Sequence, residues 1–222
     1  MIAKVNGIDL YYEVKGKGAP LILVHGNSED HTIFDIAVEK LSENFTCYLL
    51  DSRGHGESTK TQTLNYCDMA EDVVEFTKEL HLENCSYYGF SDGGIIGLIV
   101  ASKYPDLFKN LIVSGANTNP RGIRRWIYYI FKILNFFCPT CRYKMLLEQP
   151  NIADIELNRI KSRTMVLAGD RDLVLPAHTK HLASQIPGAS LKIVEGESHG
   201  SYIVHREKIA QIITDFLQPA KN

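Results

Sequence analysis

The sequence predicts an α/β protein in which a mostly parallel central sheet carries helices on both faces. Short apolar runs rich in β-branched residues alternate with longer segments of helical periodicity along most of the chain. The run Pro20–Val24 is continuously apolar, which is typical of a strand buried on both faces. With 222 residues, 45% of them hydrophobic, the chain is long enough for one compact domain with one insertion.

The expected strands are short apolar or alternating runs: Ile8–Val14, Pro20–Val24, Thr46–Leu50, Cys85–Tyr88, Asn110–Ser114, Thr164–Ala168 and Ser190–Val194. The expected helices lie between or after them: Thr32–Leu41, Met69–Leu80, Ile95–Tyr104, Ala177–Gln185 and Arg206–Leu217. Pro105 ends the third of these helices, because proline cannot continue the hydrogen-bonding pattern.

The segment 117–162 interrupts this alternation. It contains no credible strand, and Gly122–Phe137 is expected to form a helix crowded with aromatic and aliphatic side chains. We therefore divide the chain into a core of residues 1–116 and 163–222 and a helical lid of residues 117–162. Since the insertion falls where an α/β fold places its binding loops, its helix is expected to close over the mouth of a site.

The lid helix has apolar residues all round, so it is not simply a surface helix. Trp126 and Tyr129 are its expected substrate-binding residues. A contact with a membrane interface, or a homodimer through the lid, is the alternative. That alternative draws on a basic cluster: Arg121, Arg124, Arg125 and Lys132.

Charge and hydropathy limit the partners. The net charge of -2 and the isoelectric point near 6.4 predict no nucleic-acid partner and no basic field that recruits anionic lipid. No apolar stretch reaches the roughly 20 residues that span a bilayer, and the N-terminal residues lack the apolar core of a signal peptide. We expect a cytoplasmic protein without stable membrane insertion.

The cysteines predict no disulfide framework. They are five in number, and Cys47 and Cys85 lie in expected strands, where cysteine usually acts as a small buried hydrophobe. Cys138 and Cys141 form a C-x-x-C pair, for which a redox role is the alternative interpretation. No second pair is present to complete a zinc site. We expect neither a metal nor an organic cofactor.

The most informative motif is G-x-S-x-G at Gly89–Gly93, between an expected strand and an expected helix. This is the pattern of a nucleophile elbow, a strained turn that lifts a serine hydroxyl out of the sheet. Glycines are needed nearby, because a Cβ atom there would collide with the neighbouring strand or helix. Ser91 is therefore the predicted nucleophile.

A serine reacts at neutral pH only when a histidine takes its proton and a carboxylate orients that histidine. His199 lies just past the last expected strand, at the edge of the sheet where active-site loops gather. Both Asp170 and Asp172 follow the strand Thr164–Ala168. We choose Asp172, because Asp170 directly follows Gly169 and is well placed to brace the turn.

The tetrahedral intermediate of acyl transfer needs backbone donors aimed at its oxygen. Asn27 can supply one N–H group at the end of the strand Pro20–Val24, where Gly26 lets the backbone approach closely. Asp92, the residue after the nucleophile, can supply the second. Both are predicted oxyanion-hole residues, and His25 is expected to brace the loop.

Several motifs together resemble the α/β-hydrolase superfamily: His25-Gly26, Asp51-Ser52-Arg53-Gly54-His55-Gly56-Glu57-Ser58, GFSDGG, GDRD and Ser198-His199-Gly200. The resemblance implies an α/β-hydrolase fold with a short helical lid. It also implies roles for particular residues: nucleophile Ser91, acid Asp172, base His199, and oxyanion donors Asn27 and Asp92.

Within that superfamily, Gly89–Pro105 and Ser114–Asn117 are similar to the valacyclovir-hydrolase or biphenyl-hydrolase-like branch. Those enzymes favour esters of small α-amino acids, although their lid is longer and differently composed. Asp92 offers a physical reason for such a preference. Its carboxylate pairs with a substrate ammonium if it faces the pocket, or else it anchors nearby loop amides.

The predicted function is a serine hydrolase that cleaves carboxylic esters of small molecules through an acyl-enzyme intermediate. Hydrolysis of α-amino-acid esters, thioesters, lactones or carbon–carbon bonds uses the same triad with a different pocket. A non-catalytic ligand-binding protein of the same fold is an alternative of another class. An interaction protein that uses the Trp126–Phe137 face is a third.

Overall fold

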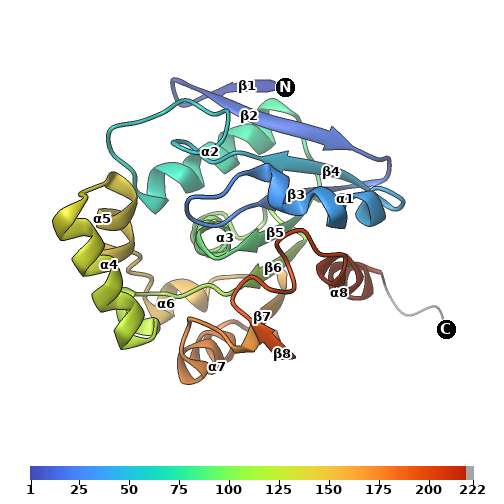
Figure 1. Ribbon diagram of the computed structural model, residues 1–222. Helices are drawn as coiled ribbons and strands as arrows, with labels where there is room; N and C mark the ends of the chain where they lie inside the picture. Colours follow the sequence, from blue (N-terminus) through green and yellow to red (C-terminus); the bar gives the residue numbers. More distant parts are fainter. Residues whose placement is uncertain (219–222) are drawn as a thin grey trace.

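The computed structural model describes residues 1–218 and contains an eight-stranded sheet (Figure 1). Its strands are β1 (Ile2–Val5), β2 (Ile8–Lys15), β3 (Ala19–Val24), β4 (Phe45–Leu50), β5 (Ser86–Phe90), β6 (Asn110–Ser114), β7 (Arg163–Arg171) and β8 (Ser190–Ser198). Their spatial order is β1-β2-β4-β3-β5-β6-β7-β8. β2 runs antiparallel to both of its neighbours, and the remaining pairs are parallel. This arrangement confirms the predicted fold class.

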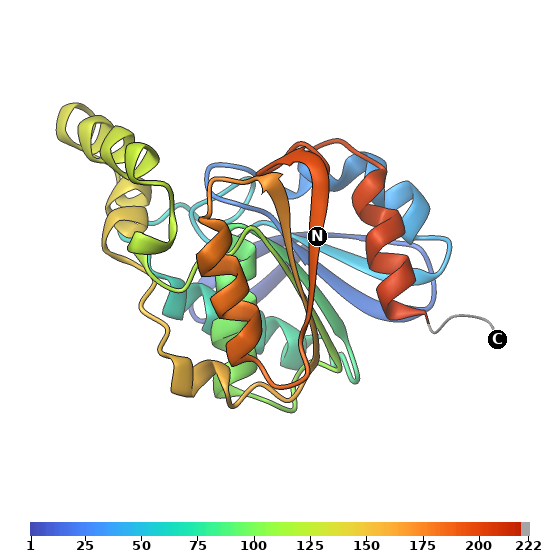
Figure 2. The same ribbon diagram turned by 90° about the horizontal axis from the view of Figure 1, so that it is seen from below.

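Alternate side chains of the inner strands enter two separate cores. Leu21 and Leu23 of β3 pack under α1 (Asp35–Leu41) and α8 (Lys208–Leu217), and a short 3-10 helix, η1 (His31–Phe34), precedes α1. Ile22 and Val24 enter the opposite core, which α2 (Tyr66–Glu79), α3 (Asp92–Lys103) and α7 (Pro176–Gln185) cover. Figure 2 shows the two groups of helices on either side of the sheet. The continuous apolar run in β3 follows from this double burial.

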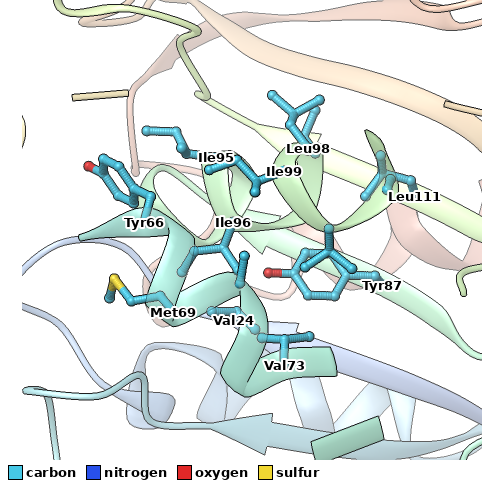
Figure 3. Close-up of a cluster of buried hydrophobic side chains, with 14 of the residues drawn as sticks. Val24, Tyr66, Met69, Val73, Tyr87, Ile95, Ile96, Leu98, Ile99 and Leu111 are labelled. Atoms are coloured by element: carbon cyan, nitrogen blue, oxygen red, sulfur yellow. The ribbon is translucent and has the colours of Figure 1, made fainter. Parts of the chain in front are cut away.

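The core between α2, α3 and the sheet fixes the turn that leads into α3. Figure 3 shows Val24 and Tyr87 from the sheet, Met69 and Val73 from α2, and Ile96 from α3 in one buried cluster. The Tyr87 hydroxyl donates a hydrogen bond to the carbonyl oxygen of Gly93 in the first turn of α3, at 2.7 Å. This bond ties the start of the helix to β5.

Some element boundaries differ from the sequence prediction. α2 begins at Tyr66 rather than Met69, because the Asn65 side chain caps the helix by accepting the N–H of Asp68. The prediction missed β1, α5 (Cys141–Glu148) and α6 (Asp154–Leu157). Elements this short carry too few residues for a periodic pattern to stand out.

The chain between β6 and β7 forms the 3-10 helix η2 (Pro120–Gly122), α4 (Arg125–Phe137), α5 and α6, with no sheet strand in residues 117–162. The helix expected at Gly122–Phe137 starts later, because Gly122 belongs to η2 and Ile123 bridges to Val174. α4 packs mainly against α5 and projects from one side of the molecule (Figure 2). None of the helices in residues 1–218 is both long and apolar enough to cross a bilayer.

Candidate active site

Ser91 occupies a sharp turn between β5 and α3. Its backbone has φ 52° and ψ -111°, an uncommon conformation for a residue with a side chain. The turn is held by the Ser91 N–H, which donates to the Ser114 carbonyl oxygen at 2.7 Å. A Cβ atom at Gly89 would overlap the Gly93 backbone, and one at Gly93 would overlap the carbonyl of Val24. Only glycine fits at these two positions, so the G-x-S-x-G pattern has a steric cause.

His199 connects the serine to a carboxylate. It follows β8, and its Nε2 lies 3.1 Å from the Oγ of Ser91, within reach of a hydrogen bond from the serine hydroxyl. Its Nδ1 lies 2.6 Å from the Oδ1 of Asp172, to which the ring N–H can donate. These three side chains, which are far apart in the sequence, form one hydrogen-bonded chain.

Asp172 is buried just after β7. Burial alone would raise the pKa of its carboxyl. The hydrogen bond and charge of His199, together with the N–H groups of Val174 and Gly169, outweigh burial and lower this pKa below its usual value. The carboxyl is therefore kept as an anion facing the imidazole.

The neighbouring Asp170 has a different position. Its side chain is partly exposed and accepts a hydrogen bond from the N–H of Gly196 at 3.0 Å. Asp170 therefore stabilises the backbone of β8 at Gly196. The structure thus brings Asp172, and not Asp170, to His199. A register shift between β7 and β8 lies at Gly169–Arg171, beside both residues.

The two predicted oxyanion donors lie beside Ser91. Asn27 follows β3 and Asp92 opens α3, and both line the cavity that contains Ser91. Among the described residues, neither backbone N–H has a hydrogen-bond acceptor. The Asp92 N–H belongs to the first turn of α3, where N–H groups have no partner within the helix and the helix dipole favours negative charge. Both groups remain available to an oxygen bound next to Ser91.

His25 stabilises the loop that carries Asn27. Its Nδ1 donates to the carbonyl oxygen of Gly26 at 2.7 Å, and its Nε2 accepts the N–H of Ser52 at 3.0 Å. Burial lowers the pKa of His25, which keeps the ring neutral and suited to this pair of roles. The ring is almost completely buried, so it acts through the loop.

The Asp92 side chain is a buried anchor that also lines the cavity. Its carboxylate accepts a hydrogen bond from the Tyr66 hydroxyl at 2.7 Å and one from the Asn27 side-chain amide at 2.9 Å. Burial raises the pKa of Asp92, although these two hydrogen bonds oppose the rise. Asp92 therefore links α2, α3 and the loop after β3.

The cavity at Ser91 has a volume of about 310 Å³. The inserted segment contributes apolar side chains to its wall, among them Ile127 and Phe131 of α4 and Leu146 of α5. Trp126 and Tyr129 do not belong to this wall, contrary to the sequence prediction. Ile127 and Phe131 are four residues apart and share the inner face of α4, whereas Trp126 and Tyr129 lie on its outer faces and are mostly exposed. Tyr129 lines a neighbouring cavity of about 870 Å³ instead.

Among the cavity residues that the sequence prediction missed are two with polar roles, Tyr66 and Glu29. Tyr66 reaches Asp92 from α2, and no local motif marks it. Glu29 lines the cavity from the loop after β3 and accepts the N–H of Gly26 at 2.9 Å. Burial raises the pKa of Glu29, although the hydrogen bond from the Gly26 N–H and the charge of His199 act to lower it. The sequence offered one signal for Glu29, which is its position three residues after Gly26, in the loop predicted to hold an oxyanion donor.

One cluster in the described residues has ligand types that suit a metal ion: Asp30, His31 and Asp51. Its central carboxylate is already engaged by the protein. Asp51 Oδ1 accepts hydrogen bonds from the backbone and the ring of His31, and Oδ2 accepts the N–H of Glu57. The cluster therefore serves to hold the loops after β3 and β4 together.

The chain belongs to the α/β-hydrolase fold family, whose model matches residues 19–144. It is similar to the human serine hydrolase BPHL, with 27% identity over 246 aligned residues that cover 96% of this chain and 84% of the relative. That aligned region is longer than this chain, so the relative has residues without a counterpart here.

Two solved structures share the fold. A thermophilic esterase from Thermogutta terrifontis matches with a TM-score of 0.79 and 22% identity, covering 98% of this chain and 97% of the other. The enol-lactonase from Burkholderia xenovorans LB400 matches with a TM-score of 0.80 and 21% identity, covering 98% and 99%. The family is thus one of hydrolases, and the predicted similarity to the biphenyl-hydrolase-like branch is confirmed.

Proposed function

We propose that this protein is a serine hydrolase that cleaves carboxylic esters of small molecules. The observation that carries the proposal is the hydrogen-bonded chain from Ser91 Oγ through His199 to Asp172, with separations of 3.1 and 2.6 Å. This is the arrangement that a nucleophile, a general base and an orienting carboxylate need for acyl transfer. The chain ends at a cavity of about 310 Å³, which suits a small ligand.

Each residue has a defined step in the proposed reaction. The Ser91 oxygen attacks the ester carbonyl carbon while His199 Nε2 takes the hydroxyl proton. The carbonyl oxygen becomes an anion that receives the backbone N–H groups of Asn27 and Asp92. Collapse of this intermediate breaks the bond to the alcohol, which leaves with the proton from His199. A water molecule then attacks the acyl-enzyme by the same route and releases the acid.

The inserted segment is proposed to act as a lid. Ile127, Phe131 and Leu146 cover the cavity from one side with apolar surface. Such a cover favours an apolar acyl or alcohol group and keeps excess water away from the acyl-enzyme. This role belongs to the inner face of α4.

The charge of the cavity favours neutral or cationic substrates over carboxylates. Two carboxyl side chains, Asp92 and Glu29, line it, and no lysine or arginine belongs to its wall in the described residues. An ester with an α-ammonium group is therefore the second candidate substrate. Each oxygen of Asp92 accepts one hydrogen bond from the protein and retains capacity for another.

A panel of matched esters tests the proposal. Short-chain and longer-chain neutral esters, an α-amino ester and its deaminated analogue are compared with an ester bearing a carboxylate. We expect turnover of neutral esters, lost in Ser91→Ala, and poor turnover of the carboxylate ester. Ester turnover that survives in Ser91→Ala would contradict the proposal. Equal specificity constants for the α-amino ester and its analogue would remove the second candidate.

A further inference from the structure

The outer surface of α4 is apolar and exposed. Its largest exposed side chains include Phe136 and Phe137, which are 78% and 77% exposed, and Trp126, which is 58% exposed. Phe136 and Phe137 pack edge to face, with ring centroids 5.1 Å apart. Among the described residues, α4 packs mainly against α5, and Figure 2 shows it as the outermost helix on its side of the molecule. An apolar surface of this extent marks a binding surface.

The exposed residues form two adjacent stripes along the helix. Positions i, i+4, i+7 and i+11 share one face of an α-helix. One stripe is entirely apolar: Trp126, Ile130, Ile133 and Phe137. The other combines aromatic and basic side chains: Arg125, Tyr129, Lys132 and Phe136. The opposite face of the helix supplies Ile127 and Phe131 to the cavity at Ser91.

The chain segment that carries these stripes is positively charged, although the whole chain has a net charge of -2. No aspartate or glutamate occurs from residue 107 to residue 147. The same stretch carries several basic residues in the inserted segment: Arg121, Arg124, Arg125, Lys132, Arg142 and Lys144. Arg124 and Arg142 are engaged by the carbonyl oxygens of Asp172 and Gly54, and the others are exposed. The net charge of the whole chain therefore does not reflect the excess of positive charge in this segment.

We propose that α4 docks this protein onto an anionic membrane surface. The helix would lie in the plane of the lipid headgroups, with Trp126, Ile133 and Phe137 directed toward the acyl chains. Arg125 and Lys132 flank these residues where the negative headgroups lie. A helix with an exposed aromatic and aliphatic face next to basic residues has the chemistry of an interfacial helix.

A second copy of the chain fits this surface less well. In a symmetric dimer through α4, the basic residues of both copies would be gathered into one interface. That arrangement has no acidic partner within residues 107–147, and the like charges would repel. An anionic bilayer complements both the apolar stripe and the positive charge.

Trp126 provides a direct test, because it is the single tryptophan of the chain and lies on the apolar stripe. The full-length protein is mixed with vesicles of phosphatidylcholine alone or of phosphatidylcholine with phosphatidylglycerol. We expect a blue shift of tryptophan emission with the anionic vesicles, and quenching by lipids with brominated acyl chains. No shift or quenching with anionic vesicles would overturn the proposal, as would equal binding to neutral vesicles.

Matched variants distinguish specific vesicle binding through α4 from non-specific hydrophobic binding. The double variant Phe136→Ser/Phe137→Ser is expected to weaken co-sedimentation with anionic vesicles by roughly tenfold or more. Arg125→Glu/Lys132→Glu should weaken it as well. The control Ile36→Ser/Ile155→Ser removes exposed apolar side chains from other helices and should bind like the wild type. Unchanged binding of the two α4 variants would overturn the proposal.

Self-association is the competing outcome. A blue shift that grows with protein concentration without vesicles, together with a dimer mass by sedimentation, would overturn the proposal in favour of a dimer surface. These measurements need no substrate, so their failure is distinct from failure of the proposed hydrolase function. Turnover of a water-soluble ester by Phe136→Ser/Phe137→Ser should equal that of the wild type, which also shows that this variant is folded.

Discussion

At the scale of single residues, the site depends on how burial and hydrogen bonds set the charge of each group. Asp172 stays ionised because His199 and two backbone N–H groups outweigh its burial. Asp92 and Glu29 are carboxyls whose pKa burial raises. The pKa values of the three carboxyls near Ser91 are therefore shifted in different directions because their environments differ.

Replacing the acid tests the catalytic arrangement. Asp172→Asn is expected to lower ester turnover by roughly 10⁴-fold, because the amide favours the wrong imidazole tautomer. Asp170→Asn is the matched control, since Asp170 braces the loop at Gly196 and should leave turnover within a few fold. Steady-state kinetics with one soluble ester measures both. A large loss in Asp170→Asn with none in Asp172→Asn would reverse the assignment.

Glu29 makes a prediction about stability and pH. Because its pKa in the folded protein is raised, the fold favours the neutral carboxyl. Protonated Glu29 contributes its full stabilisation at pH values below the pKa of this carboxyl in the unfolded chain. The stabilisation is lost as pH rises through the pKa of Glu29 in the folded protein. Glu29→Gln keeps an acceptor for the Gly26 N–H and cannot ionise.

The stability of the Glu29→Gln variant relative to the wild type should therefore increase as pH rises from acid to neutral. Urea unfolding of both proteins across that range measures this difference. If the difference between the two free energies of unfolding did not change with pH, the raised pKa of Glu29 would be refuted.

At the scale of elements, the elbow depends on backbone contacts that leave no space for a Cβ atom. Gly93→Ala would push against the carbonyl of Val24, which belongs to a central strand. We expect it to cost more than about 3 kcal/mol of stability, or to prevent folding. Gly188→Ala is the control, because its Cβ meets no atom and only its φ of 68° is unfavourable, which costs about 1 kcal/mol. Thermal unfolding should rank the two; equal costs would contradict the steric account.

The inner face of α4 makes a second prediction at this scale. Phe131→Ala removes part of the cavity wall and should lower kcat/KM for an apolar ester by roughly tenfold. Trp126→Ala should leave hydrolysis of a soluble ester unchanged, because Trp126 is on the outer face. Kinetics with esters of increasing chain length measures both effects. A loss of kcat/KM in Trp126→Ala with none in Phe131→Ala would instead support the sequence prediction that Trp126 binds substrate.

The sequence predicted the long and the deeply buried elements well. The run in β3 and the helix α3 were found because burial demands a clear apolar pattern. The positions of Ser91, His199 and Asp172 at the ends of strands were predicted from the G-x-S-x-G motif and from the order of elements along the chain. The orientation of α4 was not predictable, since a helix that is apolar on several faces does not reveal which face meets the cavity. Tyr66 was missed because its role depends on a contact 26 residues along the chain.

At the scale of the whole molecule, the inserted segment joins two surfaces of opposite chemistry. Its inner face lines a cavity with two carboxyl side chains and no basic residue in the described wall. Its outer face is aromatic and lies in a stretch without acidic residues. Arg124, the residue before α4, donates its Nε–H to the carbonyl oxygen of Asp172 at 2.7 Å. This hydrogen bond joins the start of α4, which carries the proposed membrane surface, to the backbone of the proposed catalytic acid.

Labelling with a fluorophosphonate tests the central claim most directly, because this reagent reacts much faster with a serine activated by a base and an oxyanion hole than with an ordinary serine. Intact mass and peptide mapping after labelling should show one adduct per chain, on Ser91. The adduct should be absent in Ser91→Ala and should form far more slowly in His199→Ala. A folded wild-type protein that stays unlabelled at Ser91, or that is labelled there equally fast without His199, would contradict the account.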